Sequence, residues 1–323
     1  MIKHTIKRFF TLALALALFG MSACKNASDS VDAGVTPWTA ELTLSSEKPV
    51  IKVKVTTDDG TPVTVKGCTE TELKSGIETA LNAKGTKVTL TGKITELNCD
   101  SDTLTVLNVQ GGLTALQNLS CNENQLTALN VQGCIALHSL SCNKNHRLAD
   151  LNVQGCTALQ TLSCEENQLT ALNVQDCTAL QTLRCSENQL AVLNVQGCTA
   201  LSWLGCTGNK LTALNVKDFT ALGMLSCAKN QLTDLNVQGC TALGYLDCFG
   251  NKLDATALTR ILTALPVHDG GQCTLYTDQS GVEGNHKDFT NPPTLKQAFE
   301  EAKTEKKWNM KKYGTDGSTM VNI

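Results

Sequence analysis

Residues 159–179 read LQTLSCEENQLTALNVQDCTA, and this stretch decides the fold. Its pattern, L-x-x-L-x-C-x-x-N-x-L-T-x-L-N-V-x-x-C-T-A, recurs in eight units between residues 94 and 253. Self-similarity at this period predicts a solenoid, because one unit cannot bury its apolar face alone and neighbouring units must share a core. The units are offset by 21 or 22 residues, as the first cysteine of each shows: Cys99, Cys121, Cys142, Cys164, Cys185, Cys206, Cys227 and Cys248.

Each unit has the pattern of a leucine-rich repeat with cysteine in the third apolar slot of the strand. The L-x-C segment is expected to be a short strand, and successive strands are expected to form a parallel sheet. Units of this length leave no room for full α-helices on the opposite wall, so extended or 3₁₀ segments are expected there. A buried asparagine can bond the backbone groups that the turn after each strand leaves unpaired. This column comprises Asn124, Asn145, Asn167, Asn188, Asn209, Asn230 and Asn251, with Asp102 in the first unit.

Sixteen cysteines are an unusual number for a chain of 323 residues. Besides the eight strand cysteines, a second column lies near the opposite wall, with Gly112 and Phe219 in place of cysteine. Zinc ligands usually come in pairs two to four residues apart, whereas C-x7-C recurs here, and unpaired cysteine packs as a small hydrophobe. Packed thiols are therefore favoured over disulfides, and no metal is expected. The second column comprises Cys134, Cys156, Cys177, Cys198 and Cys240.

The N-terminus has the features of an export signal. A positively charged start precedes the apolar run at 9–20, which is too short for the roughly 20 residues that span a bilayer. Residues 21–24, Met-Ser-Ala-Cys, resemble a bacterial lipobox. The resemblance implies that a lipoprotein signal peptide, 1–23, is removed and that Cys24 is lipidated; an ordinary secretory signal is the alternative. The polar residues 24–36 are expected to be a tether.

The exposed apolar ends of a solenoid need covers. Residues 37–93 are expected to form a small α+β cap before the first repeat. Alternating hydrophobicity predicts strands at 51–55 and 63–65, and the segment 69–83 has the pattern of a short helix.

Residues 254–323 are expected to form a C-terminal cap of helices and strands. Asp254 is the predicted N-cap of a helix that Pro266 ends. A last strand is expected at 273–276 and a closing helix at 295–307.

Composition and motifs argue against catalysis and against nucleic-acid binding. The net charge of −3 gives no support for nucleic-acid binding, and neither a glycine-rich phosphate loop nor an H-E-x-x-H metal motif is present. Cys142 has His138 and His146 four residues away, but its slot points into the core, where no substrate can reach it. We therefore expect no enzyme and no cofactor. Acidic residues on the strand side are expected to be a solvated face in preference to a calcium site: Asp100, Glu123, Glu165, Glu166 and Glu187.

The residues that flank the buried strand positions face the outer side of the sheet. Just before the second strand leucine, the series is polar for five units and then becomes apolar and aromatic for three. Grouped aromatic side chains on a solvent-facing sheet are typical of a binding surface; coverage by a cap is the alternative. The candidate ligand-binding residues are the anchors Trp203, Met224, Tyr245 and Phe249, with Arg184 and Asp247 as polar orienters.

The repeats resemble the internalin-type leucine-rich repeats of bacterial surface proteins, in particular the internalin J-like members whose 21-residue repeats contain cysteine. The resemblance covers residues 94–253. It implies an α/β leucine-rich-repeat right-handed solenoid with a concave parallel β-sheet, a column of unpaired cysteines and an adhesive role, and it transfers no ligand. A lipid anchor departs from wall-anchored internalins and suggests a lipoprotein of the outer-membrane cell surface.

We therefore expect a non-catalytic adhesion protein that is exported and anchored through Cys24. Its partner would be a host or bacterial surface protein or a glycan, bound on the concave face, with no role for nucleic acid. The alternative is a surface glycan-binding lipoprotein of a nutrient-uptake system, since planar aromatic side chains suit sugar stacking. An enzyme inhibitor or scaffold is a third class that the residues do not separate from an adhesin.

Overall fold

The computed structural model describes residues 38–46, 49–109, 113–281 and 284–323. The chain divides into two units, Met1–Val35 and Thr36–Ile323, and all described residues belong to the second. The predicted signal peptide at 1–23, the lipidation site Cys24 and the tether at 24–36 lie outside the described residues.

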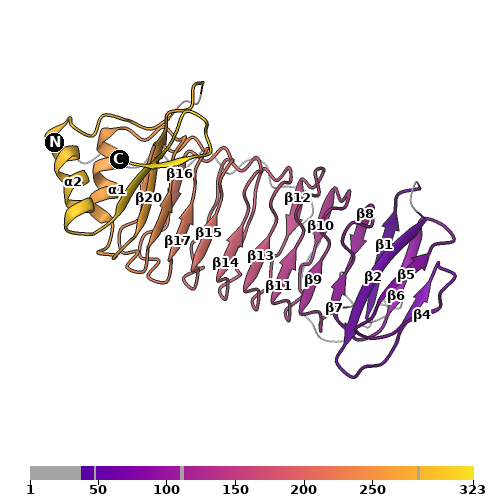
Figure 1. Cartoon of the computed structure of the whole chain (residues 1–323). Helices are drawn as coiled ribbons and strands as arrows, with labels where there is room; N and C mark the ends of the chain where they lie inside the picture. The colour runs from indigo at the N-terminus through magenta and orange to yellow at the C-terminus, as the bar shows by residue number, and fades with distance from the viewer. Residues whose placement is uncertain (1–37, 47–48, 110–112, 282–283) are drawn as a thin grey trace, which may run out of the picture. The chain divides into compact units, whose positions relative to one another are not determined.

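A 13-stranded sheet passes through all eight repeat units (Figure 1). Each unit contributes one short strand, and these strands pair in parallel in the order of the units. The leucine-rich-repeat solenoid expected from the sequence is therefore confirmed. Its repeat strands are β7 (Ile94–Asn98), β9 (Asn118–Ser120), β11 (Ser139–Ser141), β13 (Thr161–Ser163), β14 (Thr182–Arg184), β15 (Trp203–Gly205), β17 (Met224–Ser226) and β19 (Tyr245–Asp247).

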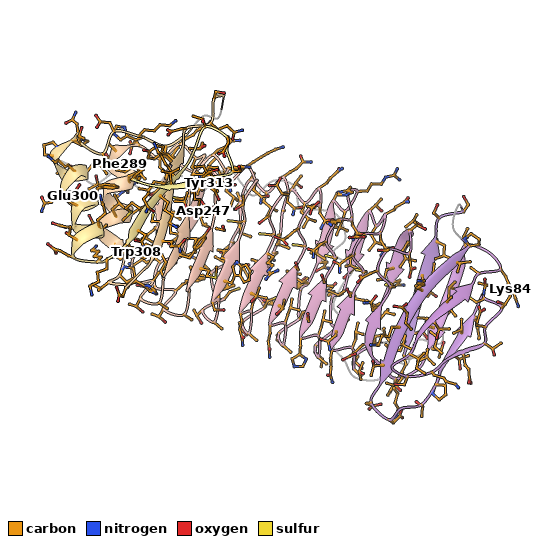
Figure 2. All side chains as sticks on the ribbon, in the orientation of Figure 1. Lys84, Asp247, Phe289, Glu300, Trp308 and Tyr313 are labelled. Atoms are coloured by element: carbon orange, nitrogen blue, oxygen red, sulfur yellow. The ribbon has the colours of Figure 1, made fainter. Side chains whose placement is uncertain are left out.

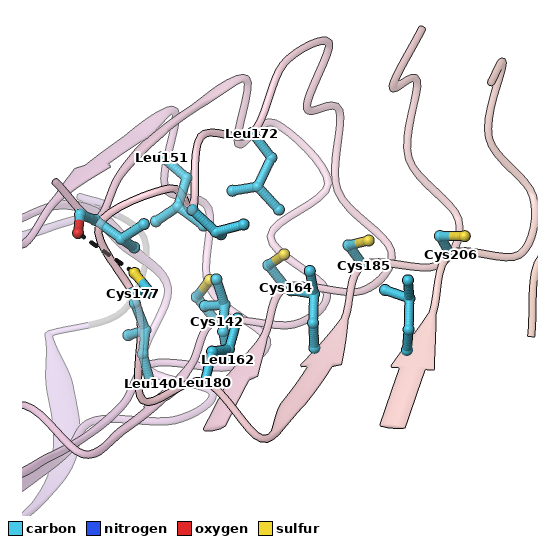
Figure 3. Close-up of a cluster of buried hydrophobic side chains, with 14 of the residues drawn as sticks. Leu140, Cys142, Leu151, Leu162, Cys164, Leu172, Cys177, Leu180, Cys185 and Cys206 are labelled. Carbon is cyan, nitrogen blue, oxygen red and sulfur yellow. Dashed lines mark hydrogen bonds between the residues drawn. The ribbon is translucent and has the colours of Figure 1, made fainter. Parts of the chain in front are cut away.

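Leucine and cysteine side chains fix the sheet to the core. The central leucine of each repeat strand is buried, and Leu162 lies opposite Leu183 in the register of neighbouring strands. The thiols of the strand column follow one another along the core, as Figure 3 shows for Cys142, Cys164, Cys185 and Cys206. A register slip of one residue would turn these leucines toward water, so the burial pattern specifies the pairing.

The opposite wall of the solenoid is extended chain, as the unit length predicts. Short strands pair there in parallel: β10 (Ala128–Asn130) with β12 (Asp150–Asn152), and β16 (Ala213–Asn215) with β18 (Asp234–Asn236). No helix occurs among the described residues between 94 and 253.

Each asparagine of the column joins two neighbouring units. Nδ2 of Asn188 donates to the backbone oxygens of Cys164, Cys185 and Ser186 at 2.9, 3.2 and 3.2 Å. Its Oδ1 accepts from the N–H of Leu169 at 3.0 Å. Because the side chain is only 7% exposed, these bonds satisfy backbone groups that water does not reach.

The second residue after each strand cysteine has left-handed backbone, with φ between 52° and 69°. Glycine adopts this conformation freely, and two of the units have a glycine at this position. The other six place a side chain in the left-handed region, at a cost of roughly 1 kcal/mol each. The eight residues are Ser101, Glu123, Lys144, Glu166, Glu187, Gly208, Lys229 and Gly250.

The chain before the first repeat forms antiparallel strands that continue the solenoid. In the large sheet, β2 (Val50–Thr57) pairs with β7, and β5 (Glu78–Asn82) pairs with β2. A seven-stranded sheet continues the opposite wall from β10 and β12 through β8 (Leu104–Asn108), β1 (Thr39–Leu44), β6 (Lys87–Thr91), β3 (Val63–Lys66) and β4 (Glu72–Leu73). The strands expected at 51–55 and 63–65 lie within β2 and β3.

The helix expected over 69–83 is wrong. This segment contains β4, a turn at Gly76 with φ 77°, and β5. Leu81 is the buried residue of β5, and the strand supplies hydrogen bonds to the free edge of β2. Those pairings outweigh the weak intrinsic preference of Glu, Leu and Ala for helix.

The chain after the last repeat extends the large sheet and adds two helices. β20 (Gln272–Thr277) pairs in parallel with β19, β21 (Asn309–Tyr313) with β20, and β22 (Met320–Asn322) turns back along β21. α1 (Ala255–Ala264) begins at Asp254, whose Oδ1 accepts from the N–H of Ala257 at 2.7 Å. α2 (Pro293–Thr304) packs against α1.

Asn285 continues the asparagine column beyond the repeats. Its Oδ1 accepts from the N–H of Leu253 at 3.1 Å, and its Nδ2 donates to the oxygens of Cys248 at 2.8 Å and Leu275 at 2.7 Å. A residue of the returning chain thus satisfies the last repeat turn, where no further unit exists to do so.

Candidate functional site

Three of the six candidate residues form one row on the solvent side of the large sheet. The register places Trp203, Met224 and Tyr245 opposite one another on β15, β17 and β19. Met224 is 40% exposed, and both aromatic residues are partly exposed. Strand spacing puts the aromatic residues about 10 Å apart with Met224 between them.

A hollow of about 240 Å³ opens on this row, and we call it the sheet-face hollow. Gly205 of β15 has no side chain and therefore leaves part of this space open. A Cβ at Gly205 would stand 3.6 Å from Oγ of Ser186 and 3.8 Å from Nε1 of Trp203. The lining residues are Glu165, Arg184, Ser186, Trp203, Gly205, Thr207, Met224, Ser226 and Tyr245.

Arg184 provides the positive charge of the hollow. Its guanidinium lies over the indole of Trp203, with Cζ 3.9 Å from the ring centroid, a cation–π contact that orients both groups. Nε of Arg184 is buried and has no hydrogen-bond partner among the described residues. None of the ion pairs between described residues includes Arg184. The charge is therefore held in place without being neutralised.

The other two candidates, Phe249 and Asp247, are covered by the returning C-terminal chain. The ring of Phe249 is 8% exposed and packs against Tyr313 of β21, with centroids 4.6 Å apart. Asp247 is 6% exposed and lies beside Tyr313, as Figure 2 shows. The two residues are therefore not open to a ligand as the sequence predicts, because Tyr313 packs against Phe249 and lies beside Asp247.

Asp247 is the most perturbed acid of this region. Burial raises the pKa of its carboxyl to about 7, although the Phe249 N–H and the charge of Lys229 act in the opposite direction. Its Oδ1 is buried and has no hydrogen-bond partner among the described residues. Burial also raises the pKa of the neighbouring Tyr245 to about 12.

The polar half of the sheet face is tied into a hydrogen-bonded ladder. Oδ1 of Asn122 accepts from Oγ of Ser141 at 2.8 Å and from the N–H of Asn143 at 2.7 Å. Oδ1 of Asn143 then accepts from Ser163 and from the N–H of Glu165 in the next unit. These side chains stabilise the stacking of units, so the polar half is structural.

A larger hollow, of about 570 Å³, lies between β18 and α1. Its charged groups, Arg260 and Asp234, pair with each other at 2.9 Å, and its lining includes no aromatic residue. Size alone would favour this hollow. The uncompensated Arg184 and the exposed aromatic row favour the sheet-face hollow instead.

All fifteen cysteines in the described residues are free and buried. Burial raises the pKa of the Cys142 thiol to about 12, which leaves it protonated at neutral pH. Four of the five thiols in the second column, those of Cys156, Cys177, Cys198 and Cys240, are directed at a valine carbonyl of the preceding unit; Sγ of Cys156 lies 3.3 Å from the oxygen of Val131. No cluster of three His, Cys, Asp or Glu residues suited to a metal occurs within the described ranges.

We predict that the thiols stay reduced in the folded protein. A thiol reagent should label few cysteines natively and most of them after denaturation without reductant, because burial blocks access in the fold. Replacing one column cysteine with serine should lower the free energy of unfolding by about 1–3 kcal/mol, through a buried hydroxyl in an apolar slot. Low labelling after denaturation would reveal disulfides and contradict this prediction.

The fold and the cysteine column define the class of protein: a leucine-rich-repeat solenoid with a cysteine ladder. Similar solved structures include the functional domain of internalin J from Listeria monocytogenes, which includes a cysteine ladder, at 32% identity and a TM-score of 0.50. That match covers 60% of this chain and 41% of the internalin J chain, so the chain spans less than half of that relative's length.

Two further solved structures match the chain at lower similarity. An internalin, InlF, from Listeria monocytogenes is 18% identical over 62% of this chain and 84% of its own, with a TM-score of 0.36. YopM from Yersinia enterocolitica is 22% identical over 56% of this chain and 36% of its own, with a TM-score of 0.41. No family model and no curated protein matches the chain.

Within the described residues, neither helix has the length and apolar character needed to cross a membrane.

Proposed function

We propose that this protein is a non-catalytic binding module that recognises a partner protein at the sheet-face hollow. Trp203, Met224 and Tyr245 are the anchors, and Arg184 orients the partner. The observation that carries the proposal is an exposed apolar row beside an unpaired cation, in a hollow that a glycine leaves open. Aromatic residues and arginine are the side chains that contribute most to binding at protein interfaces.

The chemistry of the site supports binding over catalysis. The described cysteines are buried, and the lining of the hollow includes neither histidine nor cysteine. Glu165 is the acidic group of the lining, and no nucleophile–base pair accompanies it. The matched internalin J chain is more than twice as long as the part that it shares with this protein. On the basis of this likeness, we extend the proposal to an adhesive role at a cell surface.

The double variant Trp203→Ala with Tyr245→Ala tests the site. Binding to surface-protein fragments on an array should weaken by about 2 kcal/mol or more for each anchor that acts as a hot spot. The free energy of unfolding should change by less than about 1 kcal/mol, because neither residue belongs to the closed core.

The matched control is Ser139→Ala with Thr161→Ala, which changes the same register row on two polar units. We expect it to leave both binding and stability unchanged. Binding that survives the loss of both aromatic residues would remove the sheet-face hollow from the recognition surface.

A glycan ligand is the second candidate, and the partly exposed rings of Trp203 and Tyr245 favour it. A sugar stacks on an open aromatic face, however, and Arg184 already covers one face of Trp203. A glycan array run beside the protein array separates the two candidates, since signal on the glycan array alone would support a nutrient-uptake lipoprotein.

We further propose that the protein is exported and anchored by a lipid on Cys24, at the surface of an outer membrane. The apolar run at 9–20 and the lipobox-like residues 21–24 support this. Radiolabelled palmitate should enter the wild-type protein in cells and be absent from the Cys24→Ala variant. Equal labelling of the two would exclude this anchor.

A further inference from the structure

Arg184 holds a charge that no ion pair between the described residues neutralises. Its guanidinium is fixed over Trp203 at 3.9 Å, its Nε lacks a hydrogen-bond partner, and no ion pair between described residues includes it. Arginine presents a planar fork of donors that matches a carboxylate. The stacking fixes the plane of this fork in advance, so little side-chain entropy is lost when a carboxylate binds.

The space beside this fork has the size and lining for a carboxylate with an apolar neighbour. Gly205 lies opposite Arg184 in the register and adds no side chain, and Ser226 follows in the same row. Met224 and Tyr245 form the apolar wall at the far side. Glu165 belongs to the unit next to that of Arg184, two residues after Ser163, which pairs with Arg184 in the register, and it forms none of the described ion pairs.

We propose that the sheet-face hollow binds a carboxylate of a partner peptide, with an apolar side chain of that peptide against Met224 and Tyr245. Arg184 pairs with the carboxylate, and the indole of Trp203 keeps the guanidinium in plane. The inference rests on the proposed function and narrows it from a protein partner to an acidic peptide segment. A peptide fits better than an acidic sugar because Met224, at the centre of the row, provides flexible apolar contact and no planar surface for stacking.

The test uses two small probes that differ only in charge: N-acetyl-leucine, which has a free carboxylate, and N-acetyl-leucinamide. Binding to the protein is followed by nuclear magnetic resonance at the indole Nε1–H of Trp203 and the Nε–H of Arg184. We expect the carboxylate probe to shift both signals with a dissociation constant in the low millimolar range, typical of so small a ligand. The amide should bind about tenfold more weakly or worse, because a charge-assisted bond is lost.

Two variants test whether Arg184 causes the preference for the carboxylate probe. Arg184→Gln should make the two probes bind equally weakly, and Arg184→Lys should recover only part of the preference, since lysine has a charge but no fork. Thermal melting of each variant checks that the fold is retained. Glucuronic acid serves as the sugar probe and should bind more weakly than N-acetyl-leucine.

The results of these experiments distinguish a failure of the carboxylate proposal from a failure of the proposed function. Equal binding of acid and amide, or no binding of either, overturns the carboxylate proposal. Tighter binding of glucuronic acid overturns the choice of a peptide. In each of these cases the array experiment with Trp203→Ala and Tyr245→Ala still decides whether a protein binds at the hollow.

Discussion

Asp247→Asn is expected to raise the free energy of unfolding at pH 8 by roughly 4 kcal/mol. Burial raises the pKa of Asp247 to about 7 in the folded protein, from an ordinary value of 3.8. At pH 8 the folded state therefore contains a buried, charged carboxylate that the unfolded state exposes to water. Each unit of pKa difference corresponds to about 1.4 kcal/mol. Asparagine has nearly the same shape and carries no charge, so it avoids this cost.

The sign of the pH dependence follows from the same pKa difference. Between pH 4 and pH 7 the folded state binds a proton at Asp247 that the unfolded state does not. The contribution of this group to stability is therefore greatest below about pH 4 and falls as the pH rises to about 7, above which it is constant. The Asn variant should lack this fall.

Urea unfolding of both proteins between pH 4 and pH 8 measures the effect, and the difference between them isolates Asp247 from all other titrating groups. Asp150→Asn, at an exposed position, is the matched control and should change stability by less than about 0.5 kcal/mol. Parallel profiles for wild type and Asp247→Asn would mean that water reaches this carboxylate beneath the β21–β22 hairpin.

Asn188→Ala should lower the free energy of unfolding by about 3–5 kcal/mol. The side chain makes three donated bonds and one accepted bond in a buried position, and its loss leaves the N–H of Leu169 and the oxygen of Cys164 without this partner. Each buried group left unsatisfied costs about 1–3 kcal/mol. Because the bonds join two units, the loss weakens the interface between them as well as the turn.

Asn194→Ala, in the same repeat, is the control. Asn194 is exposed, and its Oδ1 accepts one bond, from the N–H of Gln196 at 3.0 Å. Its loss should cost less than about 1 kcal/mol, because water replaces the acceptor. Equal denaturant midpoints for the two variants would refute a special role for the buried column.

The repeat fold could be predicted from the sequence because each slot of the unit has the same surroundings in every copy. The burial of Leu162 or Cys164, and the bonding of Asn188, depend on neighbours that have the same pattern. The sequence also indicated the left-handed conformation of the turn residues. Gly208 and Gly250 align with Glu187 and Lys229, and glycine at one position of a repeat indicates positive φ.

The structure of the segments at the two ends of the solenoid could not be predicted in the same way. Leu81 has the spacing of a helix residue, and the strand that includes it forms only because β2 has a free edge. Phe249 and Asp247 occupy face positions like those of Trp203. Tyr313, which lies more than sixty residues further along the chain, returns to cover them. The contact between Arg184 and Trp203 joins two residues that the pattern assigned to different rows.

Because the described repeats contain no helix, each unit adds a segment of about 4.8 Å along the sheet. Two neighbouring units have nearly interchangeable sequences, so genetic recombination between them would insert or delete a whole unit in frame. The asparagine and cysteine columns would simply become longer or shorter by one member. Such an event among the polar units would leave Arg184, Trp203 and their neighbours intact and would change only their distance from the N-terminal strands. A change in the number of units would therefore alter the reach of the proposed binding site without altering its chemistry.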